Sequence, residues 1–305
     1  MKYHVKLFEE FEGNKNDVLY YFSFDVDDNL LFMETKIHME HLVGGEWVEE
    51  SVDTETFSRI RADKNWRYLP GENSFVEFRD WGPRGDDTFL YDFKNTVKNK
   101  EYAASWPKFI ECLVNGNIFS IITSRGHHPK NIRRAIEWLI YEYGLNNFRN
   151  LPIKNVDKSE SFEDQMINNL LNYHELFGTE PEYVIDEYLD LCPIYTISSP
   201  YFKKNFGMGL LGTTKLTEDE IKAGKYSVVG EIADVSKKIA LRDFNEIVEG
   251  YASKLGLRAK YGFSDDDPKF VKAAAEEFME LKDKHKNIDY SVFDTGGDKK
   301  IKKFM

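Results

Sequence analysis

Three carboxylates directly follow a run of aromatic and apolar residues near the start of the chain. The segment 20–31 reads YYFSFDVDDNLL and places Asp25, Asp27 and Asp28 within four positions. The run before them is aromatic and β-branched without charge, which is typical of a strand buried on both faces. Carboxylates crowded at the end of such a strand shift one another's pKa unless a cation binds. The pattern therefore predicts a site for a hard divalent ion with oxygen ligands, foremost Mg²⁺.

Polar side chains also end two later strand patterns. The segment NIFSIITS (117–124) ends in Thr123 and Ser124 and is followed by Arg125, and RAKYGFS (258–264) is followed by Asp265 and Asp266. In an open parallel sheet, ligands bind at the carboxyl ends of the strands. If these strands are neighbours, all of these groups converge on one edge of the sheet.

Alternating strand and helix signals support that arrangement. Expected strands cover 18–26, 117–124, 258–264 and 290–297, and expected helices run from Pro129 to Gly144, from 236 to 257 with Ser236 as N-cap, and onward from Pro268. Such alternation predicts an α/β fold with a mainly parallel, Rossmann-like sheet, helices on both faces and inserted cap segments.

Four blocks in order resemble the haloacid dehalogenase superfamily of aspartate-nucleophile phosphatases. They are FSFDVDDNLL, FSIITSRG, the lysine-led SKKIALRDF and the acidic YGFSDDDPKFV. The resemblance implies that Asp25 attacks phosphorus to give an aspartyl-phosphate and that Asp27 acts as acid and base. It also implies that Thr123 binds the phosphoryl group and that Lys237 neutralises charge, with Lys238 as the competing assignment.

The same resemblance assigns the metal and substrate contacts. Mg²⁺ would be held by Asp25, by the main-chain carbonyl of Asp27, and by Asp265 or Asp266. Ser124 and Arg125 would contact substrate, although Arg125 is equally well suited to pair with an acidic neighbour. The chain departs from the family where Gly and Thr usually follow the second aspartate, since it has Asp28 and Asn29 there. Asn29 can still donate a hydrogen bond, whereas Asp28 either faces water or helps to hold the metal.

Several neighbouring residues have simpler explanations. Asp267 precedes Pro268 and is expected to cap the helix that begins there. His127 and His128 are expected to lie at the surface or near substrate, because no third ligand at zinc spacing follows them. An EF-hand calcium loop is excluded because Leu30 and Lys36 stand where that loop needs Gly and Glu. A phosphorelay receiver is disfavoured by the chain's length and by Asp27, which receivers lack.

The long insertions are expected to carry specificity. About ninety residues separate the first two strands, far more than a crossover requires. We expect a catalytic core over 1–35 and 105–305, with a second insertion at about 150–230, and an inserted flap or cap over 36–104. Gly44 and Gly45 indicate a hairpin over the pocket. The aromatics of 57–109 are expected to form the cap's own small core, with stacking on a substrate ring as the alternative.

The second insertion shows helix signals at 161–178 and a capping-box-like TEDE at 217–220, while its glycine-rich stretch 206–215 does not match a phosphate loop.

Composition narrows the class of protein. The chain has 305 residues, a net charge of −12, and 41% hydrophobic, 15% aromatic and 31% charged residues. This composition indicates a globular protein and disfavours a broad nucleic-acid footprint. Cys112 and Cys192 are far apart in the sequence and lack the spacing of a metal-binding motif, which suits a reducing compartment with one optional disulfide. No apolar run is long enough to span a membrane, so a cytoplasmic protein is expected. We expect a Mg²⁺-dependent phosphatase whose substrate is a phosphorylated small molecule or nucleotide. The alternative substrate is a polynucleotide end, and the alternative function is a non-catalytic scaffold that binds metal and phosphate.

Overall fold

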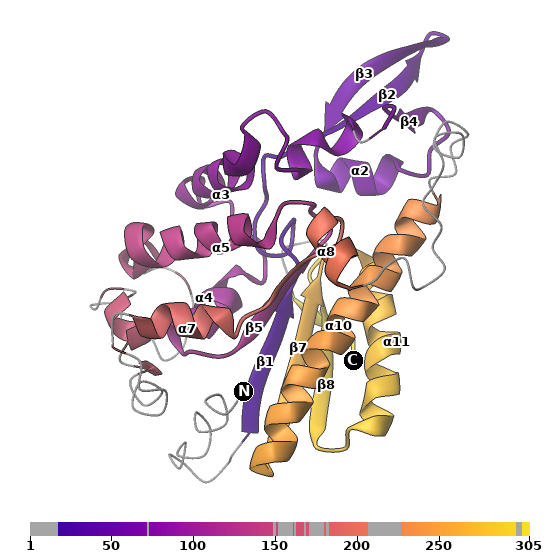
Figure 1. The fold of residues 1–305 in the computed structure, drawn as a ribbon. Coiled ribbons are helices and arrows are strands. Elements are labelled where there is room, and N and C mark those ends of the chain that lie inside the picture. Colours follow the sequence, from indigo (N-terminus) through magenta and orange to yellow (C-terminus); the bar gives the residue numbers. More distant parts are fainter. Residues whose placement is uncertain are drawn as a thin grey trace.

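A mainly parallel six-stranded sheet forms the centre of the protein (Figure 1). The computed structural model describes residues 18–71, 73–148, 151, 161, 163–167, 169–170, 180, 183–206, 227–296 and 301–305. The strand order is β6 (Ile194–Thr196), β5 (Phe119–Thr123), β1 (Val18–Phe24), β7 (Arg258–Asp265), β8 (Ile288–Asp294) and β9 (Lys302–Lys303). All neighbours are parallel except β9, which runs antiparallel to β8. The predicted α/β class and mainly parallel sheet are confirmed.

Helices cover both faces of the sheet because successive side chains of β1 point to opposite sides. Tyr21 packs against Phe244 of α10 (Ser227–Leu255), with ring centroids 6.3 Å apart. Phe24 packs on the other face against Phe109 of α4 (Trp106–Val114), at 5.7 Å. α11 (Pro268–Lys284) lies beside α10 and against β7 and β8. The core is therefore apolar above and below β1, as its uncharged sequence predicts.

Further helices surround the β5 and β6 side of the sheet. α3 (Thr88–Asn99) packs on α5 (Pro129–Trp138), which continues through a π-helical turn, η3 (Leu139–Tyr143), to Gly144. Gly144 has a φ of 79°, so it ends this helix in a conformation that favours glycine, as predicted. The described residues also form α7 (Val184–Asp190), α8 (Pro200–Asn205) and the short 3₁₀ turns η1 (Asn73–Phe78), η2 (Gly85–Asp87) and η4 (Leu145–Phe148).

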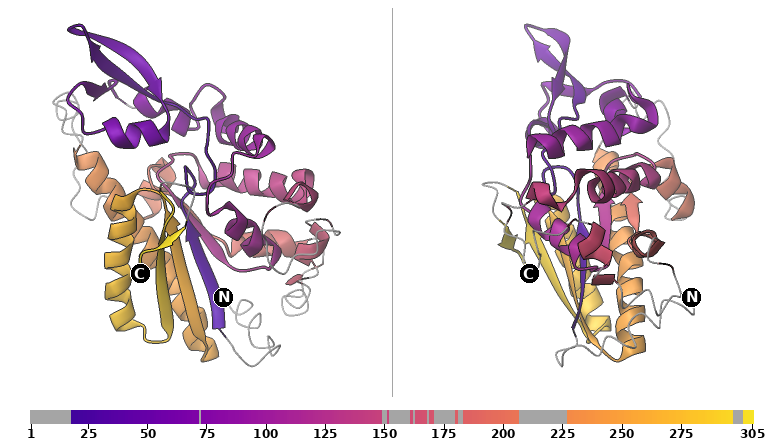
Figure 2. Two further views of the ribbon diagram at one scale, coloured as in Figure 1. Left: turned by 180° about the vertical axis from the view of Figure 1, so that it is seen from behind. Right: turned by 90° about the vertical axis from the view of Figure 1, so that its left-hand side faces the viewer.

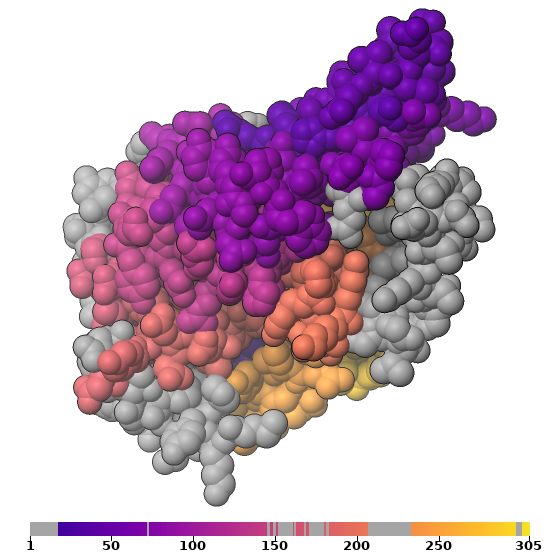
Figure 3. Space-filling view, turned by 45° about the horizontal axis from the view of Figure 1, so that its top comes forward, coloured from indigo at the N-terminus to yellow at the C-terminus, as the bar shows by residue number. Residues whose placement is uncertain are grey.

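A small antiparallel sheet with one helix projects from the body, and we call residues 37–68 the flap (Figures 2 and 3). It contains β2 (Ile37–Val43), β3 (Glu46–Val52), β4 (Trp66–Tyr68) and α2 (Thr54–Ile60), in the sheet order β3-β2-β4. Gly44 and Gly45 form the turn with φ values of 61° and 92°, which confirms the predicted hairpin. A second apolar cluster joins the flap to η1. It consists of Ile37, Met39, Val52 and Phe78, with Phe57, Ile60, Trp66 and Phe75 packed against it.

Several sequence-based expectations need correction. Helix α10 begins at Ser227, so Ser236 lies inside the helix and is not its N-cap. The segment between the two serines contains no proline that would prevent the helix from starting earlier. β6 lies in the second insertion, where no strand was expected, and β9 follows the strand expected to be last. The aromatics of 57–109 divide between two cores, since Phe89 and Trp106 belong to the main one. They therefore do not form one small cap core.

The structure bears on two further expectations. Cys112 and Cys192 are both buried free thiols, so the optional disulfide is absent. Among the described residues, no helix is long and apolar enough to cross a bilayer. Of the expected helix over 161–178, only 161, 163–167 and 169–170 are described, and 163–167 is helical. The stretch beyond Phe206 in 206–215, and all of 217–220, lie outside the described residues.

Candidate active site

The carboxyl ends of β1 and β7 bring the two acidic segments side by side. Phe24 pairs with Ser264 across the two strands, and the backbone N–H of Asp25 donates to the Ser264 carbonyl at 3.1 Å. Asp25 and Asp265 therefore lie at the carboxyl ends of two neighbouring strands, although 240 positions separate them in the chain. One carboxylate oxygen from each of Asp25, Asp265 and Asp266 lies within 4.8 Å of the others. We call these three residues the acidic cluster.

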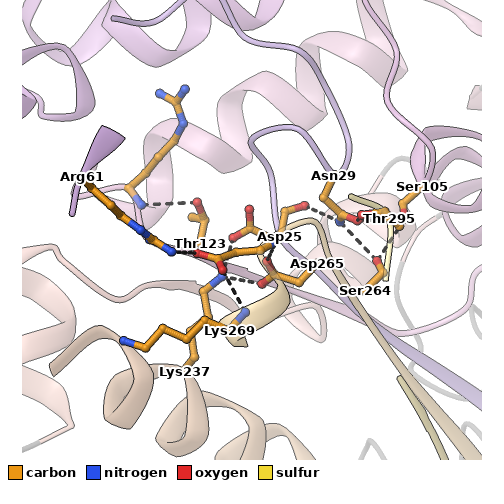
Figure 4. Close-up of polar contacts among 12 residues, drawn as sticks. Asp25, Asn29, Arg61, Ser105, Thr123, Lys237, Ser264, Asp265, Lys269 and Thr295 are labelled. Carbon is orange, nitrogen blue, oxygen red and sulfur yellow. Dashed lines mark hydrogen bonds and ion pairs between the residues drawn. The ribbon is translucent and has the colours of Figure 1, made fainter. Parts of the chain in front are cut away.

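Lys237 of α10 lies against this cluster, as Figure 4 shows. Its Nζ donates to Asp25 Oδ1 at 3.0 Å and to Asp265 Oδ2 at 2.6 Å, and its side chain is only 4% exposed. The neighbouring Lys238 instead pairs with Glu276 at 3.4 Å on the outside of the helix. Of the two lysines that the sequence left open, the structure places Lys237 at the cluster and Lys238 away from it.

An asparagine fixes the loop that carries Asp25 (Figure 4). Asn29 Nδ2 donates to the Asp25 carbonyl at 2.9 Å and to Ser264 Oγ at 3.2 Å. Its Oδ1 accepts from Ser105 Oγ at 3.0 Å and from Thr295 Oγ1 at 2.9 Å. This buried amide joins the loop after β1 to the end of β7, the start of α4 and the residue after β8. The roles of Ser105 and Thr295 had no signal in the sequence, because both act only through this distant amide.

The β1 loop also connects to the flap. Asp28 has a φ of 56°, and its Oδ2 accepts from Thr54 Oγ1 at 2.5 Å, at the start of α2. Burial raises the pKa of Asp28 to about 6, although the Thr54 hydrogen bond opposes this shift. Asp28 therefore neither faces open water nor joins the acidic cluster; it ties the loop to the flap.

The β7 loop makes the second connection. Asp267 caps α11 by accepting from the backbone N–H of Lys269 at 2.9 Å, which confirms the predicted capping role. Its other oxygen accepts from Arg61 Nη2 at 3.0 Å, just beyond the end of α2. α2 is thus tied to both acidic loops, one at each of its ends.

The β5 end contributes three polar residues with different surroundings. Thr123 is buried, and its Oγ1 accepts from the Arg125 backbone N–H at 3.3 Å, whereas Ser124 is exposed. Arg125 is fully buried and binds Asp27 through two hydrogen bonds, Nε to Oδ2 at 2.9 Å and Nη2 to Oδ1 at 2.6 Å. Of the two roles expected for Arg125, the structure shows the pairing with an acidic neighbour. The Asp27 side chain faces this arginine and not the acidic cluster.

The two histidines at the start of α5 differ. His128 caps α5 by accepting from the Lys130 backbone N–H at 3.2 Å. His127 is completely buried against Phe89, with ring centroids 5.5 Å apart, so the expectation of a surface position is wrong for this residue. α3 packs over the loop and covers it. Burial, helped by the charges of Arg125 and Arg79, lowers the pKa of His127 to about 2, so the ring is neutral.

The electrostatics of the acidic cluster are unfavourable without a cation. Burial, reinforced by neighbouring carboxylates, raises the pKa of Asp25 to about 8 against the opposing charge of Lys237, and raises that of Asp266 to about 9. Burial also raises the pKa of Asp265. Lys237 remains protonated because the two aspartates outweigh its own burial and raise its pKa. One ammonium group cannot neutralise three carboxylates, so a second positive charge fits this cluster.

The donor set indicates which cation fits. Asp25, Asp265 and Asp266 offer only carboxylate oxygens within reach of one another, and no described His or Cys belongs to the cluster. Oxygen-only ligands suit Mg²⁺ or Ca²⁺ better than zinc. The sequence leaves open whether Asp265 or Asp266 binds the metal. In the structure, both residues lie beside Asp25.

Comparison with known proteins finds no matching family model, no matching curated protein and no matching solved structure.

Proposed function

We propose that the protein is a Mg²⁺-dependent phosphatase of the haloacid dehalogenase type, with a Rossmann-like core and Asp25 as the nucleophile. One observation carries the proposal: Lys237 of α10 and the carboxylates of Asp265 and Asp266, all far from Asp25 in sequence, surround the Asp25 carboxylate. The buried Thr123 ends β5, the strand that neighbours β1 on the other side. Phosphoryl transfer requires mainly positioning and charge stabilisation, and this set can supply both.

In the first step, an Asp25 carboxylate oxygen forms a bond to phosphorus while the bond from phosphorus to the ester oxygen breaks. The leaving oxygen takes a proton from Asp27. In the second step, water gives a proton to Asp27 as its oxygen attacks phosphorus, and the bond to Asp25 breaks to release inorganic phosphate. Lys237 neutralises Asp25 and the phosphoryl oxygens throughout. In this proposal, Thr123 at the end of β5 donates to a phosphoryl oxygen.

Asp25, Asp265 and Asp266 would hold the Mg²⁺, which when bound supplies positive charge next to the phosphoryl oxygens. The substrate class is a phosphorylated small molecule or nucleotide, because the net charge of −12 disfavours a long polyanion. The runner-up substrate is a polynucleotide end, and the runner-up function is a non-catalytic scaffold that binds metal and phosphate without turnover. A cytoplasmic location fits this reading.

The decisive experiment is hydrolysis of p-nitrophenyl phosphate with Mg²⁺ and with EDTA. We expect Mg²⁺-dependent turnover in the wild type and none in Asp25→Asn. The matched control is Asp267→Asn, which removes a carboxylate at the same edge but outside the cluster and keeps an acceptor for the helix cap. Equal turnover by Asp25→Asn and the wild type would refute the nucleophile. Stabilisation by Mg²⁺ with beryllofluoride, in a wild type without turnover, would favour the scaffold.

A further inference from the structure

Asp27 belongs to a chain of buried polar contacts that reaches the hinge of the flap. Arg125 Nη2 donates to Asp27 and also to Thr35 Oγ1, the latter at 2.8 Å. Thr35 Oγ1 in turn donates to Asp92 Oδ2 of α3 at 3.0 Å. Thr35 lies two residues before β2, where the backbone leaves the core for the flap. We call Asp92, Thr35, Arg125 and Asp27 the positioning chain.

The direction of each hydrogen bond in this chain is fixed by chemistry. A guanidinium group only donates and an ionised carboxylate only accepts, so the single Thr35 proton must point to Asp92 and its lone pair to Arg125. Two aromatic rings restrict the guanidinium further: it lies 4.7 Å from the Phe78 centroid and 5.3 Å from the Phe89 centroid. Arg125 therefore has one orientation, and through its two bonds it gives Asp27 one orientation as well.

Asp27 takes part in both halves of the proposed reaction, as the acid toward the leaving oxygen and as the base toward water. Its two hydrogen bonds from Arg125 fix the position of both carboxylate oxygens. With a leaving group that needs no proton, only the second half of the reaction depends on this position.

We propose that Thr35 and Asp92 are positioning residues that, through Arg125, orient Asp27 as the base of the second step and couple that orientation to the hinge of the flap. This inference rests on the proposed function and deepens it. Thr35 and Asp92 touch neither phosphate nor metal in this role. Their effect passes entirely through Arg125.

The test is Thr35→Val, which has nearly the same shape and removes the hydroxyl that joins Arg125 to Asp92. With p-nitrophenyl phosphate, whose leaving group needs no proton, the first step should continue while the second slows. We expect kcat to fall by about 10-fold or more, because a positioned general base contributes roughly 10²–10⁴-fold. Acid-quenched enzyme should then retain covalently bound phosphate on most molecules. Thr35→Ser, which keeps the hydroxyl, should restore turnover and remove the trapped phosphate.

Thr96→Val is the matched control. Thr96 lies on α3 and, like Thr35, is buried. Its hydroxyl has no hydrogen-bond partner among the described residues. This variant should behave as the wild type. A fall in turnover for Thr35→Val without accumulation of phosphorylated enzyme would overturn the proposal, because a purely structural role reduces both steps together. Unchanged kinetics would overturn it too.

The failure of the proposed function would look different. If the wild type neither turns over nor becomes phosphorylated, the phosphatase assignment fails. The positioning chain is then judged by a crystal structure of Thr35→Val. Loss of the two Arg125–Asp27 hydrogen bonds supports the positioning role, and an unchanged pair refutes it.

Discussion

Replacement of Lys237 by methionine tests the electrostatics of the acidic cluster directly. Lys237 Nζ lies 3.0 Å from an Asp25 oxygen and 2.6 Å from an Asp265 oxygen, with the three side chains 4%, 8% and 1% exposed. Each attraction is worth about 6 kcal/mol at an effective dielectric constant of about 20, before desolvation is subtracted. Removal of one partner from such a buried group costs about 3–5 kcal/mol, because the carboxylates lose their compensation.

The expected loss depends on pH in a definite direction. The folded protein holds the pKa of Asp25 at about 8 and that of Asp266 at about 9, above the ordinary value of 3.8. Well below pH 8 these two carboxylates are mostly protonated in the folded state, so Lys237 has little of their charge to compensate. Its compensating effect appears as pH rises through 8–9, where Asp25 and Asp266 ionise. Lys237→Met should therefore cost about 3–5 kcal/mol at pH 8 and clearly less at pH 5.

Urea unfolding followed by tryptophan fluorescence, in EDTA at both pH values, measures this difference. The control is Lys238→Met, which removes the adjacent lysine and its exposed pair with Glu276 and should cost less than about 1 kcal/mol. Added Mg²⁺ should restore part of the stability of Lys237→Met. Equal losses in the two variants at pH 8, or a loss in Lys237→Met that does not change with pH, would refute the assignment of Lys237 to the cluster.

Three further predictions follow from contacts around the site. Asn29→Ala should lower the free energy of unfolding by about 3 kcal/mol in chemical denaturation, since it leaves buried hydroxyl groups without their amide partner. Asp267→Ala should lower the free energy of unfolding by about 1–2 kcal/mol, because the cap of α11 is lost. Arg61→Ala should lower it by at most about 1 kcal/mol, because only a partly exposed ion pair is removed. The difference between the urea midpoints of the two variants checks this prediction. His127 stays neutral in the folded state down to a pKa of about 2, so only the unfolded chain takes up its proton below pH 6.5. Stability should therefore fall with acidity by up to about 1.4 kcal/mol per pH unit from this residue, and His127→Phe should reduce the difference in urea midpoint between pH 7.5 and pH 5.

The sequence predicts those parts of the fold that have local signals. β1 and β5 were recognisable as uncharged apolar runs, and Asp267 before Pro268 marked the start of α11. The convergence of Asp25 with Asp265 followed from one geometric rule, that neighbouring parallel strands end at the same edge. These predictions needed no knowledge of distant contacts.

The missed features depend on contacts that local patterns do not contain. Arg125 and Asp27 are 98 positions apart, and Thr35 and Asp92 are 57 apart. Nothing in the immediate neighbourhood of Thr35 distinguishes it from an ordinary loop threonine. The sequence predicts His127 at the surface or near substrate, yet its ring is buried against Phe89 of α3. β6 has only three residues and therefore too short a pattern to detect.

The two attachments of α2 divide the flap into a part that is constrained by the pocket and a part that is free of it. Thr54 and Arg61, at either end of α2, contact the two acidic loops, so changes in this helix reach the pocket directly. The hairpin tip projects from the body, and a Cβ at Gly44 or Gly45 would meet none of the described residues within 4 Å, apart from the adjacent ones in the chain. Substitutions at residues 44 and 45 should therefore leave the pocket unchanged, whereas substitutions within residues 54–61 should alter it.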